Sequence, residues 1–194
     1  NAIPSFTYKY RKIIFIFSSI IFVLSIITVS NIKVDSNVVR YFKEDYWVTK
    51  DMKYFDETFK GIQNVEYILD SGIEGGAKNP EFLEKVEDFE NYLENLQESE
   101  KSTTLLDFLK QIRKAFTENN EDYYILPDNS DMTAQLLFVY ENSGPEEDLS
   151  DLKDFENRYV RLTLPIVNMT SNEMLKFLDK TEKYANENFE EMNV

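Results

Sequence analysis

The sequence predicts an α+β protein in which one N-terminal transmembrane helix precedes a domain whose helices pack on one face of a small sheet. Three observations support this class. Residues 13–29 form an uncharged apolar run, residues 65–69 and 158–167 have the character of strands, and apolar residues recur every three or four positions in the segments between and after those strands. Strands and helices mixed in this order are typical of an α+β sandwich with split βαβ elements.

Composition limits the chemistry available to the chain. Its 194 residues include no His and no Cys, which excludes a Ser-His-Asp or Cys-His nucleophile, a thiolate redox centre and a zinc site of the usual ligands. Asp and Glu number 36 against 21 Lys and Arg, and the formal charge of −15 argues against a nucleic-acid partner because phosphates attract basic side chains. The aromatic share of 14% is too high for a disordered acidic tail, so we expect a folded chain.

The clearest feature is the run IIFIFSSIIFVLSIITV at residues 13–29, which contains no charge, Gly or Pro. Extended to Ile32 it reaches 20 residues, the length that spans a hydrocarbon core of about 30 Å. A core helix of a soluble protein is one alternative, but no other segment is apolar enough to bury it. A cleaved signal peptide is another, although its apolar region is usually about 7–15 residues and Thr28-Val29-Ser30 is a poor cleavage site. An uncleaved membrane helix is the preferred interpretation.

Charges on the two sides of the run predict its orientation. Lys9, Arg11 and Lys12 precede it, and the positive-inside rule places them in the cytoplasm, whereas all 36 acidic residues follow it. We therefore expect a cytoplasmic basic flank at 1–12, a transmembrane helix at 13–33 and an extracytoplasmic domain at 34–194, located at the cell membrane. Because the chain begins with Asn rather than Met, we interpret it as a segment of a longer protein. Aromatic residues suited to the two membrane interfaces bracket the run: Tyr8, Tyr10, Tyr41, Phe42 and Trp47.

The first extracytoplasmic elements are short. Residues 32–39 alternate apolar and polar side chains and predict a strand, while residues 41–58 predict a helix capped by Gly61. Residues 65–69 predict the next strand. The glycine-containing stretch 70–76 is interpreted as a surface loop, since the alternative, a phosphate-binding loop, would need a P-loop lysine or the dinucleotide-binding spacing. The apolar side chains expected to share one face of the first helix are Met52, Phe55 and Phe59.

Three amphipathic helices are predicted in the middle of the chain. The first begins at Pro80 after an Asn79 cap, the second after Thr103 or Thr104, and the third after Ser130 or Asp131, ending at Ser143-Gly-Pro. Apolar side chains at helical spacing mark the packed face of each helix. These faces are Phe82, Leu83, Val86, Phe89, Leu93 and Leu96; Leu105, Leu106, Phe108, Leu109, Ile112 and Phe116; and Leu136, Leu137, Val139 and Tyr140.

The strongest strand signal lies at residues 158–167, where apolar and polar side chains alternate around Val160, Leu162 and Leu164. Pro165 in this segment predicts an edge strand or a bulge. A final amphipathic helix is expected after a Ser171 cap. Its predicted packed face consists of Met174, Leu175, Leu178, Tyr184 and Phe189.

No group of residues indicates catalysis. Neither 128–131 nor 148–154 has the ligand spacing of a calcium-binding loop. Arg158 and Arg161 are expected to pair with nearby acids. Asn168-Met-Thr matches the glycosylation sequon. We expect no enzyme activity, no cofactor and no metal site, and leave the substrate-binding residues open. The apolar run also lacks a mid-membrane carboxylate or Lys, so the proton relay of any pump lies in other helices. The acidic residues interpreted as a solvated helix face are Glu84, Glu87, Asp88, Glu90, Glu94 and Glu98.

An ordered series of motifs resembles the resistance-nodulation-division (RND) exporters of the MMPL type. After the basic flank and the apolar helix comes VDSNVVRYFKEDYWVTKDMKYFDETFKG, similar to the family's V-D-(T/S)-N … Y-F stretch. The likeness continues, in order, at NPEFL, LLDFLK, YILP, AQLLFVYENS and RLT, and so covers nearly the whole chain. Two departures are Lys101-Ser-Thr, where the family often has a Val-containing turn, and the strand between the first two extracytoplasmic helices, which is barely visible.

The resemblance implies a porter-like domain with ferredoxin-like βαβ subdomains, within one half of a proton-motive-force-driven exporter of lipids or other hydrophobic molecules. The implied partners are the lipid bilayer, a hydrophobic or lipid-like substrate, and the remaining helices and other half of the same transporter. The YFK and YENSG stretches favour the second half. One alternative is a single-pass membrane-anchored binding or adhesion domain without transport activity. Another is an anchored hydrolase, which the missing His and Cys disfavour.

Overall fold

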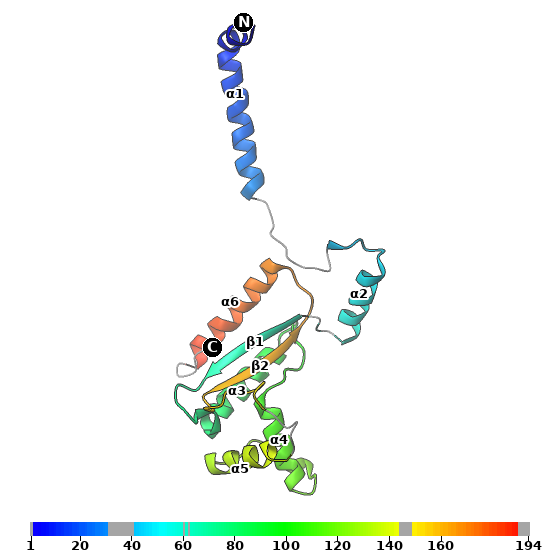
Figure 1. Cartoon of the computed structure of the whole chain (residues 1–194), viewed down its shortest axis with the longest axis vertical. Coiled ribbons are helices and arrows are strands. Elements are labelled where there is room, and N and C mark those ends of the chain that lie inside the picture. The colour runs from blue at the N-terminus through cyan, green and yellow to red at the C-terminus, as the bar shows by residue number, and fades with distance from the viewer. Residues whose placement is uncertain (1, 31–40, 60, 62, 144–148, 190–194) are drawn as a thin grey trace. The chain divides into compact units, whose positions relative to one another are not determined.

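The computed structural model describes residues 2–30, 41–59, 61, 63–143 and 149–189, which form six α-helices and one two-stranded antiparallel sheet (Figure 1). The chain divides into two compact units, Asn1–Ser36 and Asn37–Val194, each of which is described by itself. The strand predicted at 32–39 and the last residues of the predicted span, 31–33, lie outside the described residues. The α+β class is confirmed.

The first unit consists of helix α1, Ala2–Ser30. Its described side chains from Arg11 to Val29 are all exposed. The hydroxyls of Ser25 and Thr28 donate hydrogen bonds of 2.8 Å to the carbonyl oxygens of Ile21 and Leu24, one turn earlier. The hydrogen of each hydroxyl is therefore bonded within the helix itself.

The second unit begins with helix α2, Trp47–Phe59, which starts six residues later than predicted. Thr49 is 3% exposed and its hydroxyl donates to the Lys43 carbonyl oxygen at 3.0 Å, while Val48, Met52 and Asp56 are half-buried. Phe55, which was expected on the packed face, is 51% exposed, so that part of the prediction was wrong. Gly61 follows at φ 142°, and a Cβ there would lie 2.7 Å from the Pro165 Cβ, which explains the glycine.

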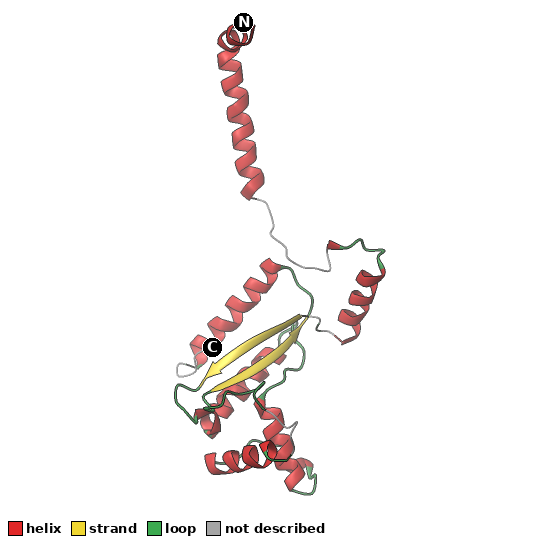
Figure 2. Cartoon of the chain, in the orientation of Figure 1, coloured by secondary structure: helices red, strands yellow, loops and turns green. Residues whose placement is uncertain are grey.

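The sheet pairs β1, Gln63–Asp70, with β2, Tyr159–Ile166, in antiparallel register (Figure 2). Every second residue of each strand is buried, as the alternation at 158–167 predicts. The N–H groups of Arg161, Thr163 and Val167 donate away from β1, to the carbonyl oxygens of Leu152, Thr103 and Glu98. Pro165 falls in the same outward series, so its missing N–H leaves the ladder with β1 intact.

The segment at Ser99–Thr103 lies along the other edge of β2. Antiparallel bridges join Ser99 to Ile166 and Thr103 to Thr163, with N–H to oxygen distances of 2.9 and 3.0 Å for the second pair. No strand was predicted for this segment, and its composition explains why. Residues 98–104 read ESEKSTT and contain no apolar side chain, so neither strand periodicity nor hydrophobicity marks them.

Helix α3, Pro80–Glu94, begins as predicted, with the Asn79 side chain accepting from the Glu81 N–H. The predicted stripe is buried apart from Leu96, which is half-buried. Helix α4, Leu105–Phe116, is capped by Thr104, whose hydroxyl and the Asp107 carboxylate close a capping box. Both starts were recoverable from sequence because a cap is a local interaction of three or four residues.

Helix α5, Ser130–Glu141, packs against α4 and is capped by Asn129, not by Ser130 or Asp131 as expected. Arg113, buried on α4, donates to the Leu126 carbonyl oxygen and pairs with Asp128 at 2.9 Å. These bonds fix the loop that leads into α5. Phe116 and Val139 were expected in the packed faces but are 60% and 41% exposed, respectively.

Helix α6, Ser171–Asn188, is capped by Thr170 and its capping-box partner Glu173, one residue before the predicted Ser171 cap. Its buried side carries Phe177, Thr181 and Ala185, whereas the predicted core residue Leu175 is 64% exposed. The sheet residues buried beneath the helices are Val65, Tyr67, Leu69, Val160, Leu162, Leu164 and Ile166. Because these residues alternate along both paired strands, they share one face of the sheet.

Candidate functional site

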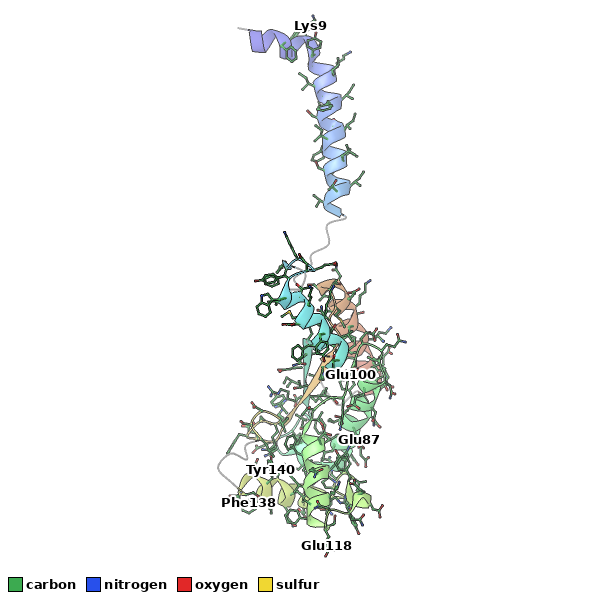
Figure 3. The ribbon with its side chains drawn as sticks, turned by 90° about the vertical axis from the view of Figure 1, so that its right-hand side faces the viewer. Lys9, Glu87, Glu100, Glu118, Phe138 and Tyr140 are labelled. Carbon is green, nitrogen blue, oxygen red and sulfur yellow. The ribbon has the colours of Figure 1, made fainter. Side chains whose placement is uncertain are left out.

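The most distinctive surface of the molecule is α1. Its residues Tyr8–Val29 form a stretch of 22 residues in which an 18-residue window has a mean hydropathy of 2.5 and no buried residue, so α1 is not a core helix within its unit. Lys9, labelled in Figure 3, lies with Arg11 and Lys12 at the N-terminal end of this stretch. An exposed apolar helix at this place in a chain serves either as a membrane anchor or as a signal sequence.

Aromatic side chains gather at the start of the second unit. Tyr46 stacks on Phe42 with ring centroids 5.7 Å apart and contacts Trp47 at 6.0 Å. Tyr54 lies seven residues after Trp47, which places the two on the same side of α2, and each is 64% exposed. The helix thus presents large aromatic rings away from the side that carries buried Thr49.

A buried acidic group joins α3 to the segment alongside β2. Glu90 is 6% exposed, and the Ser102 hydroxyl lies 2.7 Å from its Oε1 and 2.8 Å from the Oε1 of Glu94. The Ser102 N–H also donates to Glu94 Oε1 at 2.8 Å, so Glu94 is the acceptor of this group. The interpretation of the acidic residues of 84–98 as a solvated face was therefore wrong for Glu90, which lies four residues after buried Val86 on the packed side.

Burial raises the pKa of the Glu90 carboxyl above its ordinary value of 4.5. The Ser102 hydroxyl opposes this shift, while the carboxylates of Asp107 and Glu94 act with burial and Lys110 acts against it. One hydroxyl has one hydrogen, yet two carboxyl oxygens lie within hydrogen-bond distance of Ser102 Oγ. The Ser102 hydrogen is therefore shared between Glu90 and Glu94, and the Thr104 hydroxyl lies 3.4 Å from the same Glu90 Oε1.

Two arginines on β2 and its approach pair with acids, as expected from sequence. Arg158 contacts both carboxylate oxygens of Asp70 at 2.7 Å, a bidentate pair that lowers the pKa of Asp70. Arg161 lies 3.8 Å from carboxylate oxygens of Glu66 and Asp151. The Arg158 pair ties the end of β1 to the start of β2, which assigns it a structural role.

Described residues line at least three surface hollows, with volumes of about 400, 430 and 420 Å³. The first lies between the segment after β2 and α6, with Met169 and Phe177 as its apolar wall and Lys176 and Lys180 at its rim. The second adjoins Asp107, Phe108 and Tyr124, and the third adjoins Phe138 of α5 (Figure 3). Their similar size and mixed linings single out none as the substrate site.

Across the ranges that the structure describes, no three acidic side chains are grouped so that they could hold a metal ion. The polar networks around Glu90 and Asp70 are each closed by hydroxyl, N–H or guanidinium donors from the chain itself. Exposed apolar surfaces of the described chain include helix α1 and the aromatic residues at and before the start of α2. The apolar run at 13–29 predicted the first, and Phe42 and Trp47 of the second were expected at a membrane interface.

Comparison with known proteins adds no relative: no protein-family model, curated protein or solved structure matches the chain.

Proposed function

We propose that this chain is a segment of a proton-motive-force-driven exporter of lipids or other hydrophobic molecules, supplying one transmembrane helix and part of the extracytoplasmic substrate-path domain. The observation that carries the proposal is α1. It is exposed and carries no charge from Ile13 to Ser30, three basic residues precede this stretch, and every acidic residue follows it. This asymmetry supports an anchored domain outside the cytoplasm. The export activity and its hydrophobic substrate rest on the resemblance to RND exporters of the MMPL type.

The strand arrangement supports the finer part of the proposal, a porter-like domain with ferredoxin-like elements. β1 is antiparallel to β2, and β2 is antiparallel to the segment Ser99–Thr103, so β1 and that segment run parallel with β2 between them. Helix α3 connects the two parallel segments along the chain. This order is that of a split βαβ unit. Helices α4 and α5 are then an insertion before β2, and α6 follows β2 as the second helix of the unit.

In this proposal the domain moves against its partner half while protons cross other helices of the transporter. The described α1 carries no charged residue between Lys12 and Ser30, so it contributes anchoring and mechanical connection rather than proton transfer. The acidic domain forms a wall of the substrate path. The bilayer, the hydrophobic cargo and the other half of the transporter are the partners.

The size of the native polypeptide tests the proposal. An antibody raised against residues 34–194 should detect, in membranes of the source organism, a product several times larger than the 22.9 kDa of residues 1–194. A single band near that mass would overturn the exporter and leave the alternative, a single-pass membrane-anchored binding or adhesion domain. The exposed α1 and the closed polar networks of the domain are compatible with that alternative as well, so mass is the discriminating quantity.

A further inference from the structure

The side of α2 that faces away from the domain is aromatic. Thr49, Met52 and Asp56 lie on the inner side, where Thr49 is buried and the Asp56 carboxylate accepts from the Asn168 N–H at 3.2 Å. Trp47 and Tyr54 lie on the opposite side, at a spacing of seven residues. The inner side of α2 thus carries a carboxylate that accepts from Asn168, and the rings of Trp47 and Tyr54 remain exposed.

These rings continue beyond the helix. The stacked pair of Phe42 and Tyr46 extends the row to Trp47, and we call Phe42, Tyr46, Trp47 and Tyr54 the aromatic surface. Their exposed fractions are 42%, 46%, 64% and 64%. Phe42, Tyr46 and Trp47 contact one another in series, and Tyr54 lies two helical turns after Trp47 on the same side of α2. Such a group of exposed rings marks an interaction site, because isolated exposed apolar residues are common but clusters of them are costly in water.

Two features identify the chemistry of the partner. Trp and Tyr concentrate at membrane–water interfaces, where the ring is buried and the N–H or O–H stays hydrated. The covalent chain also limits how far this surface can lie from the apolar helix: at about 3.5 Å per residue, the twelve residue steps from Val29 to Tyr41 cover at most roughly 40 Å. The aromatic surface is therefore always within reach of any bilayer that α1 spans.

We propose that the aromatic surface lies in the headgroup region of the extracytoplasmic leaflet, with α2 resting on the bilayer as an interfacial helix. The inference rests on the spanning role of α1 in the proposed function, and it goes further by assigning a second, independent membrane contact. Within residues 42–54 the charges balance, since Lys43, Lys50 and Lys53 match Glu44, Asp45 and Asp51, so no net charge of this stretch draws it to anionic lipid. Aromatic burial drives it, and zwitterionic lipid suffices.

The chain carries its own reporter, since Trp47 is its one tryptophan. The full chain is reconstituted into phosphatidylcholine vesicles containing lipids brominated near the headgroup end of the acyl chain. We expect loss of Trp47 emission on bromination, a blue-shifted emission maximum and protection from aqueous iodide, all retained at high salt. The matched control is the double variant Trp47→Phe/Phe155→Trp, which keeps one tryptophan but moves it to a site that is 97% exposed in the domain. Its emission should be unaffected by bromination.

Resistance of the same vesicles to carbonate extraction separates the two proposals. A chain that is retained by the membrane, while Trp47 emits as in water and is quenched by iodide but not by brominated lipid, overturns the interfacial contact and leaves the spanning helix. A chain released by carbonate overturns the spanning helix itself. Quenching by bromine that disappears at high salt would also contradict the proposal, since it would indicate an electrostatic contact. The variant Tyr54→Ser should reduce the quenching of Trp47 without changing retention.

Discussion

The Oε1 atom of Glu90 on α3 lies 2.7 Å from the hydroxyl of Ser102, so a buried carboxyl anchors the segment that borders β2. The same hydroxyl lies 2.8 Å from Glu94, and two residues further on Thr104 caps α4. Ser102 therefore joins the Ser99–Thr103 segment, which leads into α4, to two carboxyl groups of α3. Burial raises the pKa of one of them, Glu90.

The first prediction concerns the pH dependence of stability. The pKa of Glu90 is raised in the folded chain, so between about 4.5 and that higher value the native state binds more protons than the unfolded state. The stability contributed by Glu90 is complete below pH 4.5 and is lost as pH rises through its native pKa. The variant Glu90→Gln should remove this decrease in stability with rising pH. Urea unfolding of the parent and the variant in detergent from pH 4 to 8 gives the free energy of unfolding of each.

Glu84→Gln is the matched control, because Glu84 is exposed on the same helix. The difference in unfolding free energy between this control and the parent chain should stay constant over the same pH range. If the Glu90→Gln difference is equally constant, the Glu90 carboxyl titrates as it does in the unfolded chain, which contradicts its burial on α3.

A second prediction concerns Asp70. Its bidentate contact with Arg158 lowers the pKa of Asp70 below the ordinary 3.8, so its contribution to stability is present above pH 3.8 and is lost as pH falls through the native value. Arg158→Gln should return the Asp70 pKa toward 3.8 in a carboxyl-carbon NMR titration. Arg161→Gln, which removes an arginine whose closest carboxylates are 3.8 Å away, should leave the Asp70 titration unchanged.

A third prediction tests the core. Phe89 is fully buried, and its ring contacts Tyr67 of β1 at 5.4 Å and Phe189 after α6 at 6.0 Å. Phe89→Ala should lower the unfolding free energy by about 3–5 kcal/mol, since it leaves a cavity where sheet and helices meet. Phe138→Ala, at a ring that is 66% exposed, should change it by no more than about 0.5 kcal/mol. Equal losses in the two variants would contradict the observed packing.

A fourth prediction tests the membrane helix. Phe22 lies near the middle of the stretch Tyr8–Val29 and is 67% exposed. Phe22→Asp should raise the free energy of insertion by about 2.5–3.5 kcal/mol and reduce recovery in carbonate-washed membranes. Phe22→Leu retains an apolar side chain and should behave as the parent does. Undiminished recovery of the Asp variant would speak against a spanning helix.

Sequence patterns identified the elements but placed several details wrongly. The starts of α3 and α4 followed from local caps at Asn79 and Thr104. The caps of α5 and α6 were predicted one or two residues too late, because each true cap is followed by other residues that are equally good cap formers. Leu175 was assigned to the core by helical spacing, yet Phe177 occupies that side of α6. Which side of an amphipathic helix is buried depends on the elements that pack against it, and the sequence of the helix alone does not specify them.

The sequence alone determined the apolar helix, the acidic character of the domain, the two strands and the helices between and after them. Each of these depends on local propensity, on periodicity or on charge, which are properties of contiguous residues. Only the tertiary structure decided that the polar stretch 98–103 borders β2, that Glu90 is buried against Ser102, and that the rings of Trp47 and Tyr54 point away from the core. Those outcomes arise from contacts between segments far apart in the chain, where backbone pairing and the burial of competing side chains override the local pattern.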